Sequence, residues 1–271
     1  MNRTWFLSDL EFFVLWQDWV GDHLPAPLLF TSRAVRWVEF MREVSIARER
    51  LHHELDGSFT QVLETIARPE LRIVVHGVDG ENPQNPQRSI RMLVARCGDR
   101  GYRVVQAPGE TIWHSGGFEV TELGGEGIAR AVVESLPRVP AGALGEITLP
   151  DEHDQADVDY SLQRSMVTAS AFGDSADHRT STFLRARADT VGVVKVTQGR
   201  SKFGPRGLST QIVSWRDLHG DGRYVISARR PSIAVAADSN RFRAIVNLAV
   251  RTVSDAVEDE QDWPRSQSAP W

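Results

Sequence analysis

The 271-residue chain contains 41% hydrophobic and 25% charged residues, a composition that supplies a packed core and argues against disorder throughout. Its formal net charge of −5 argues against general binding to nucleic-acid phosphates, which needs a basic surface. The single cysteine, Cys97, excludes an internal disulfide, and the lack of a signal sequence and of any apolar run near ~18 residues predicts a cytoplasmic protein without membrane insertion.

Three helices are predicted near the N-terminus. A short strand at 4–7 precedes Ser8-Asp9-Leu10-Glu11, which fits a capping box and predicts a helix that ends near Val20. Apolar residues at spacings of three and four predict a long helix over Thr31 to Leu55. A shorter helix over Ser58 to Arg68 should end at Pro69.

A block of strands follows. The sequence predicts a strand over Leu71 to Gly77, a hairpin over Arg88 to Gln106, a strand over Glu110 to Val120 and a helix over Leu123 to Leu136. The polar loop Val78 to Gln87 separates the first strand from the hairpin. Loops of this kind often carry binding residues, although a plain exposed connection also fits.

Pro137 to Glu152 is rich in proline and glycine and is interpreted as a connection between two halves. It ends in an acidic cluster (Asp151, Glu152, Asp154, Asp157 and Asp159) that lacks the ordered spacing of metal ligands. The elements predicted after it are helices over 158–172 and 174–187, a strand over 191–198, a loop over 199–207, a hairpin over 208–230, a strand over 232–236 and a helix capped by Asp238.

The two halves repeat one order of elements. Each runs helix, strand, long polar loop, hairpin, strand and amphipathic helix, an αββββα unit. Because the helices of one unit can cover only one face of its sheet, the units must share a core or join edges. We therefore predict an α+β fold with pseudo-twofold symmetry, a central mostly antiparallel sheet and two helical groups.

The domain organisation follows from this duplication. We expect a single domain over residues 1–258, made of an N-terminal half (1–136), a connection (137–152) and a C-terminal half (153–258). Residues 259–271 are charged and contain proline, which predicts a flexible tail.

No catalytic motif is present: the nucleophile elbow, the phosphate-binding loops and the zinc-protease helix are all missing. We therefore expect no enzyme activity, no cofactor and no metal. The basic loop Gly199 to Gly207 could hold a phosphate through Arg200, Lys202 and Arg206, could be a solvated loop, or could contact a protein through Phe203. No helix follows it, which weakens the phosphate interpretation.

Several stretches, in order, resemble the EspG family, the ESX (type VII) secretion-associated proteins of actinobacteria. The similarity runs over about Phe6 to Val257. It rests on Leu10-Glu11-Phe12 with Leu15-Trp16, LPAPL (24–28), ARPE (67–70) before a strand, GYRVVQAPGE (101–110), SLP (135–137), GPRG (204–207), the SWRD–DGRY hairpin (214–217 and 221–224) and the terminal helix.

The resemblance implies a cytosolic chaperone with the pseudo-twofold fold described above. Such proteins bind PE–PPE heterodimers before export, cover the aggregation-prone tip of the PPE partner and need no nucleotide or metal. By position, the implied contact regions are the loop after the first strand, the sheet around two tryptophans and the basic loop. The expected contact residues are Asp79, Glu81, Asn82, Gln84, Asn85, Trp113, Lys202, Phe203, Arg206 and Trp215.

Trp113 and Trp215 lie on predicted strands and could instead belong to the core. Two other functions stay open at this point. One is a phosphate-ligand enzyme or sensor that uses the Gly199–Gly207 loop. The other is a structural dimer, although a monomer or weak dimer is expected. No nucleic-acid partner is expected.

Overall fold

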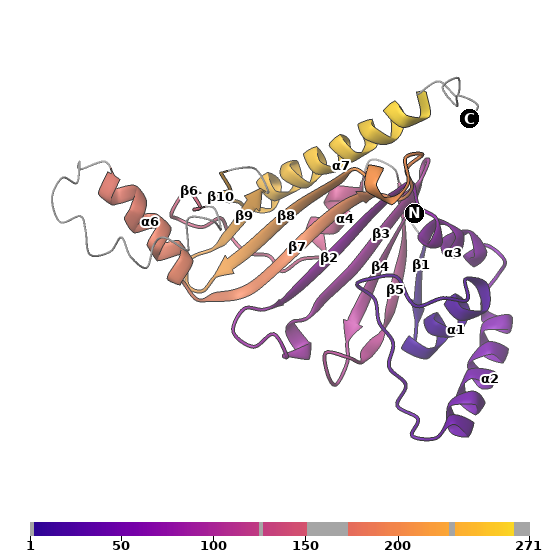
Figure 1. Cartoon of the computed structure of the whole chain (residues 1–271). Coiled ribbons are helices and arrows are strands. Elements are labelled where there is room, and N and C mark those ends of the chain that lie inside the picture. Colours follow the sequence, from indigo (N-terminus) through magenta and orange to yellow (C-terminus); the bar gives the residue numbers. More distant parts are fainter. Residues whose placement is uncertain (1–2, 125–126, 151–172, 228–230, 263–271) are drawn as a thin grey trace.

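One antiparallel sheet of ten strands runs through the computed structural model, which describes residues 3–124, 127–150, 173–227 and 231–262 (Figure 1). The strand order is β1-β5-β4-β3-β2-β7-β8-β9-β10-β6. The predicted α+β fold with a central antiparallel sheet is confirmed. No helix in the described part of the chain has the length and apolar composition needed to cross a membrane.

The N-terminal half contributes the first five strands. They are β1 (Thr4–Leu7), β2 (Leu71–Asp79), β3 (Ile90–Cys97), β4 (Arg100–Pro108) and β5 (Ser115–Gly124). The loop between β2 and β3 holds the short 3-10 helix η1 (Pro86–Arg88).

The C-terminal half contributes the other five strands. They are β6 (Glu146–Thr148), β7 (Ala188–Gln198), β8 (Thr210–Leu218), β9 (Arg223–Ser227) and β10 (Ile233–Ala236). The β7–β8 loop holds the 3-10 helix η3 (Pro205–Gly207), which matches the position of η1 in the first half.

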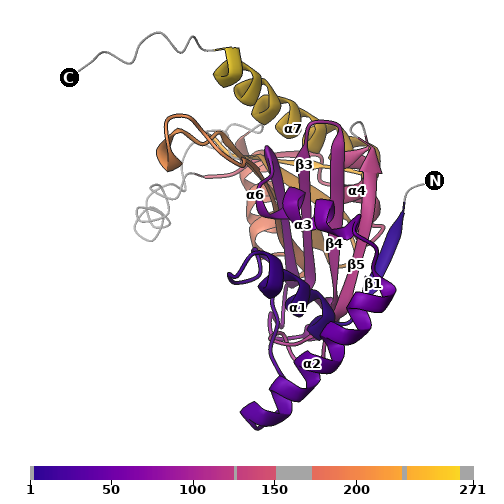
Figure 2. The same cartoon turned by 90° about the vertical axis from the view of Figure 1, so that its right-hand side faces the viewer.

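Three helices lie on the N-terminal half of one sheet face: α1 (Asp9–Trp19), α2 (Trp37–Glu54) and α3 (Phe59–Ala67). There α1 packs on β5, α3 packs on β3 and β4, and α2 packs on α1 (Figure 2). The predicted capping box begins α1: the Ser8 hydroxyl accepts from the Glu11 amide at 3.2 Å, and the Glu11 carboxylate accepts from the Ser8 amide at 2.8 Å. At the far end of the same face lies α6 (Gly173–Arg185), whose Phe183 is buried against Tyr224.

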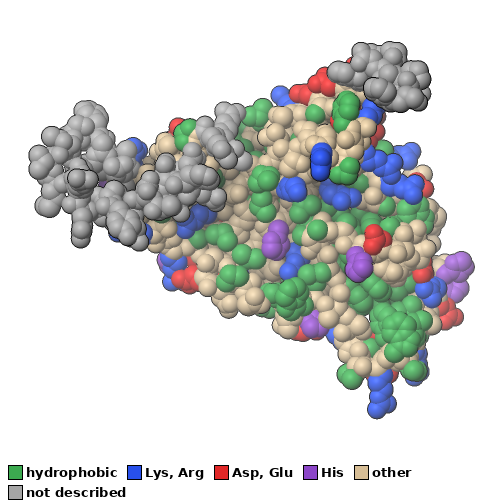
Figure 3. Space-filling view, in the orientation of Figure 1, with side chains coloured by type: hydrophobic (Ala, Val, Ile, Leu, Met, Phe, Trp, Pro, Cys, Tyr) green, Lys and Arg blue, Asp and Glu red, His purple; other side chains and the backbone are tan. Residues whose placement is uncertain are grey.

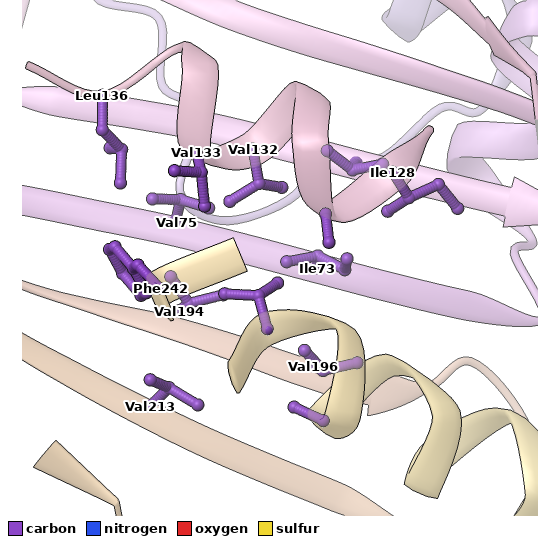
Figure 4. Packing of buried hydrophobic residues seen from close by; sticks show 14 of the residues in the cluster. Ile73, Val75, Ile128, Val132, Val133, Leu136, Val194, Val196, Val213 and Phe242 are labelled. Atoms are coloured by element: carbon purple, nitrogen blue, oxygen red, sulfur yellow. The ribbon is translucent and has the colours of Figure 1, made fainter. Parts of the chain in front are cut away.

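Two helices, one from each half, cover the opposite face. They are α4 (Ile128–Glu134) and α7 (Ser239–Asp262). α7 packs on β7 and β8, and α4 packs on β5 and against α7. Their apolar residues form one cluster with those of the sheet, in which Figure 4 labels Ile128, Val132 and Phe242 together with Ile73, Val194 and Val213. This cluster draws on both halves of the chain, so they share one core.

The seam between the halves is the β2–β7 pair. Residues 71–79 pair antiparallel with residues 190–198, and Val75 opposite Val194 is the middle pair. On either side of this seam the order α3-β2-β3-β4-β5-α4 is repeated by α6-β7-β8-β9-β10-α7, as the duplication predicts. The repeat is longer than predicted, because an edge strand precedes the helices in each half: β1 pairs with β5, and β6 pairs with β10.

Several predicted boundaries were wrong. The strand predicted from Glu110 begins at Ser115, and the helix predicted from Leu123 begins at Ile128, because Leu123 still belongs to β5. Residues 31–36 are not helical, because Thr31 and Arg33 are held by the chain after β4: the Thr31 hydroxyl donates to the Trp113 carbonyl, and Arg33 pairs with Glu110. The predicted connection 137–152 contains β6. The predicted tail starts too early, because α7 continues to Asp262. The predicted helix 158–172 and the acidic cluster 151–159 lie outside the described residues.

Candidate partner-binding surface

Among the described residues, helices cover the middle of the sheet on one face only. Leu71, Ile73 and Val75 of β2 point into the core under α4 and α7, so the residues between them point to the other face. The same alternation holds on β7 and β8. We call the resulting surface the central strip: Arg72, Val74, His76 and Val78 of β2; Arg91 of β3; Val193, Lys195 and Thr197 of β7; Thr210, Ile212 and Ser214 of β8.

The central strip lies between the two helical groups. The described helices of this face pack on β3, β4 and β5 at one end and on β6 at the other. Lys195, Thr210 and Ile212 are therefore exposed and the other members are half-buried, whereas the opposite side of the same strands is buried. Figure 3 looks onto this face and shows basic and histidine side chains among apolar ones over the middle strands.

The charged groups on the central strip are cations. Burial lowers the pKa of the Arg72 and Arg91 guanidinium groups, and burial followed by the positive charge of Arg91 lowers the pKa of His76. His76 and Arg91 stand directly opposite each other in the β2–β3 ladder. The strip itself contains no aspartate or glutamate.

The β2–β3 loop, which carries half of the predicted contact residues, is preorganised by Asp79. One carboxylate oxygen of Asp79 accepts from the amides of Glu81 and Asn82 at 3.0 and 3.2 Å, and the other accepts from the Asn85 side chain at 2.9 Å. These bonds, with the backbone bond first, lower the pKa of Asp79. The side chain of Asp79 is therefore committed to the fold of the loop, while Gln84 is exposed.

The same loop is fastened to the C-terminal half. The Glu81 carboxylate lies 2.5 Å from the Arg187 guanidinium, just after α6. The Gly80 amide donates to the Asp189 carbonyl, and a side chain at Gly80 would meet the Ala188 carbonyl oxygen at 2.2 Å. The loop thus extends the central strip at its α6 end with a rigid, polar margin.

Trp113 is 62% exposed, but it is not on a strand as predicted. The segment before β5 forms a turn, because the Thr111 hydroxyl accepts from the Trp113 amide at 3.1 Å and bonds the His114 ring at 2.8 Å. The turn lies at the same end of the sheet as the β2–β3 loop, since β3 and β4 pair antiparallel. Trp113 remains available to a partner.

Trp215 is 1% exposed and belongs to the core under α7, where its ring contacts Phe242. Its predicted role as a contact residue is therefore corrected: the side chain has no surface to offer. The ring lies flat over the seam, because a side chain at Gly192 would meet it at 2.2 Å and one at Gly77 at 3.1 Å. Of the two tryptophans, one is core and one is surface.

The β7–β8 loop lies at the other end of the seam, roughly 27 Å from the β2–β3 loop for a strand of nine residues. One of the three cations of this loop is already bonded: the Lys202 ammonium donates to the main-chain oxygens of Glu260 and Gln261 at the end of α7. The Glu260 carboxylate accepts from the Ser201 hydroxyl and the Lys202 amide. Ser201 and Lys202, two groups that a phosphate could use, are thus occupied, while Phe203 is 59% exposed and Arg200 and Arg206 are exposed.

The predicted contact residues do not form one site. The β2–β3 loop and Trp113 lie at one end of the sheet, Lys202, Phe203 and Arg206 at the other, and Trp215 inside. Sequence reasoning missed the central strip that links them. The available signal was the alternation of basic and apolar residues in LRIVVH and VVKVT, which a strand buried on both faces would not show.

The comparisons with known proteins agree with this architecture. A model of the EspG family matches residues 8–247. Among solved structures, the chain is similar to the Mycobacterium tuberculosis type VII secretion system chaperone EspG5 in complex with a PE25–PPE41 dimer. The TM-score is 0.58 and the sequence identity 17%, over 94% of this chain and 96% of that chain, a likeness of fold. No curated protein sequence matches. Because the family model covers most of its length, the chain belongs to the EspG family.

Proposed function

We propose that this protein is a cytoplasmic chaperone of type VII secretion that binds a PE–PPE heterodimer and covers the apolar tip of the PPE partner until export. The observation that carries the proposal is the central strip, a partly exposed sheet face with apolar residues between two helical groups, in a member of the EspG family. The solved complex of EspG5 with a PE25–PPE41 dimer supports the proposal, because there a protein of similar fold binds a partner of the proposed class.

The physical basis is the burial of apolar surface. Val74, Val193 and Ile212 form an acceptor for an apolar helix end, and the β2–β3 loop and Trp113 give it a polar and aromatic margin. A cover of this kind acts by mass action, since it stabilises the soluble complex relative to aggregates of the free partner. Such binding needs no catalytic group.

Co-expression tests the proposal. The tagged chain is produced together with each PE–PPE pair encoded in the genome of its source, and complexes are separated by size-exclusion chromatography with light scattering. We expect one pair to elute with the chain at a 1:1:1 ratio, and its PPE partner to aggregate without the chain. If no pair co-elutes, the proposed function is wrong.

The phosphate-ligand alternative is weakened because Ser201 and Lys202 of the Gly199–Gly207 loop are bonded to the end of α7, which leaves Arg200 and Arg206 as its exposed cations. A thermal-shift screen with nucleotides and sugar phosphates checks it at little effort. We expect a flat response across the panel.

A further inference from the structure

Several arginines of this protein are paired with carboxylates. Arg33 pairs with Asp9 and Glu110, Arg48 with Asp18, and Arg103 with Glu119. Even the buried Arg223 is matched by Asp217 at 2.6 Å. The two arginines of the central strip are half-buried without such a partner: among the described residues, neither Arg72 nor Arg91 has a carboxylate within ion-pair distance.

Two cations of the strip also lie close to each other. Lys195 stands opposite Val74, which is two residues from Arg72 on β2, so Lys195 and Arg72 are diagonal neighbours. Side chains directly opposite across a ladder lie about 5 Å apart at Cβ and diagonal ones about 7–8 Å, and like charges at such distances repel. The Nε atom of Arg72 is buried without a hydrogen-bond partner in the described structure. The strip therefore carries positive charge that the described fold does not neutralise.

A third arginine of this face, Arg216, does have hydrogen-bond partners within the protein. Arg216 donates to the carbonyls of Phe183 and Ala186 at 3.2 and 3.0 Å, and its guanidinium lies over the Phe183 ring. It anchors the C-terminal end of α6. Arg72 and Arg91 make no such contacts with the described residues, so their positions on a partly exposed face point to an external anion.

The apolar residues between the cations restrict what that anion can be. Val74 and Val193 lie beside Arg72, His76 and Lys195, and Ile212 is 43% exposed next to them. A nucleic acid or free phosphate would leave these apolar surfaces uncovered, and the net charge of −5 opposes a polyanion. A protein surface with apolar side chains flanked by carboxylates matches both features.

We propose that the central strip selects PE–PPE partners by charge. It binds a PPE tip whose apolar residues are flanked by aspartate or glutamate, and these carboxylates pair with Arg72 and Arg91. This inference rests on the proposed function and adds the chemistry of the recognised tip. Lys195 strengthens the positive field, and the apolar neighbours exclude water from the pairs, which makes each pair stronger than an exposed one.

The test compares charge reversal on the two faces of the sheet. The double variant Arg72→Glu/Arg91→Glu is matched by Arg130→Glu/Arg251→Glu, which changes the net charge equally on the face of α4 and α7. Circular dichroism melting establishes that both fold. The dissociation constant of each for the PE–PPE pair captured by the wild-type chain is measured by biolayer interferometry.

We expect the strip variant to bind at least about tenfold more weakly and the control to stay within about twofold of wild type. Replacing the flanking carboxylates of the partner tip by lysine should restore binding to the strip variant. If the strip variant binds as tightly as wild type, or if the captured tip lacks carboxylates, this inference is wrong and the proposed function stands. If wild type captures no pair, the proposed function fails first and this inference falls with it.

Discussion

At the scale of single residues, Gly192 and Gly77 leave the space that the Trp215 ring of β8 occupies over the seam. The Trp215 ring occupies the space above β7 and β2 that any side chain at Gly192 or Gly77 would need. Trp215 is buried because its side chain points to the face that α7 covers, and the two glycines leave room for its ring there. The sequence alone could not predict this contact, because nothing in it indicates that Gly77 or Gly192 lies next to Trp215.

The first prediction follows from this contact. Gly192→Ala places a methyl group 2.2 Å from the Trp215 ring and should destabilise the protein by about 1–3 kcal/mol through overpacking. Urea unfolding measures the effect. The matched control is Gly124→Ala on β5, where a methyl group meets nothing within 4 Å. Equal midpoints for the two variants would contradict the proposed packing.

His76 gives a prediction for pH. Its pKa lies below the ordinary 6.5, first because of burial and then because of Arg91. The unfolded chain therefore binds a proton at a higher pH than the folded chain, so this contribution to stability is present above pH 6.5 and is lost as pH falls through the folded pKa. The free energy of unfolding should decline less between pH 7.5 and 5.5 in His76→Gln than in wild type. Parallel curves would show that His76 is not the group responsible.

At the scale of elements, the two loops between the first and second strands of each half are fastened in different ways. The β2–β3 loop is held by one of its own side chains, Asp79, and the β7–β8 loop by the end of α7 through Glu260. Each loop is thereby set at one end of the central strip. Their positions follow from the β2–β7 register and not from their own sequences.

Hydrogen exchange tests the role of Asp79. In Asp79→Ala, the amides of Glu81 and Asn82 lose their acceptor and should exchange several-fold faster, while the strands keep their protection. Gln84→Ala removes an exposed side chain of the same loop and should leave these amides unchanged. Unaltered exchange in Asp79→Ala would mean that the loop is ordered by its contacts with Arg187 and Asp189 alone.

Most elements could be predicted from the sequence, because capping and periodicity are local. The box at Ser8 and the apolar stripe of α7 are examples. The errors arose where tertiary contacts override local preference: residues 31–36 are held away from a helix by Trp113 and Glu110, and the three-residue strand β6 forms only against β10. The central strip combines residues from four strands, so its existence depends on a register that the sequence does not state.

At the scale of the whole molecule, the duplication puts the halves in one sheet and not in two domains. Both halves contribute to the core beneath α4 and α7. At the seam, the edge of β2 from the N-terminal half pairs with β7 from the C-terminal half. The shared symmetry places the helical groups on one face at opposite ends. The central strip is the part of that face which the described helices of neither group cover.

The halves should therefore depend on each other. A chain of residues 1–136 exposes the β2 edge and the apolar face that α7 covers, so we expect it to aggregate or to lack a cooperative unfolding transition. Size-exclusion chromatography and thermal circular dichroism measure this. A folded monomer with a sharp transition would show that the N-terminal half is an independent domain.

Site-specific photo-crosslinking tests the central claim, that the partner docks on the central strip, most directly. A benzophenone amino acid is placed at Ile212 of the strip or at Leu248 on α7, two exposed apolar positions on opposite faces (43% and 55%). After irradiation of the source cells, crosslinked proteins are identified by mass spectrometry. We expect a PPE protein to be crosslinked to position 212 and no PPE protein to be crosslinked to position 248. A PPE crosslink from 248 with none from 212 would contradict it.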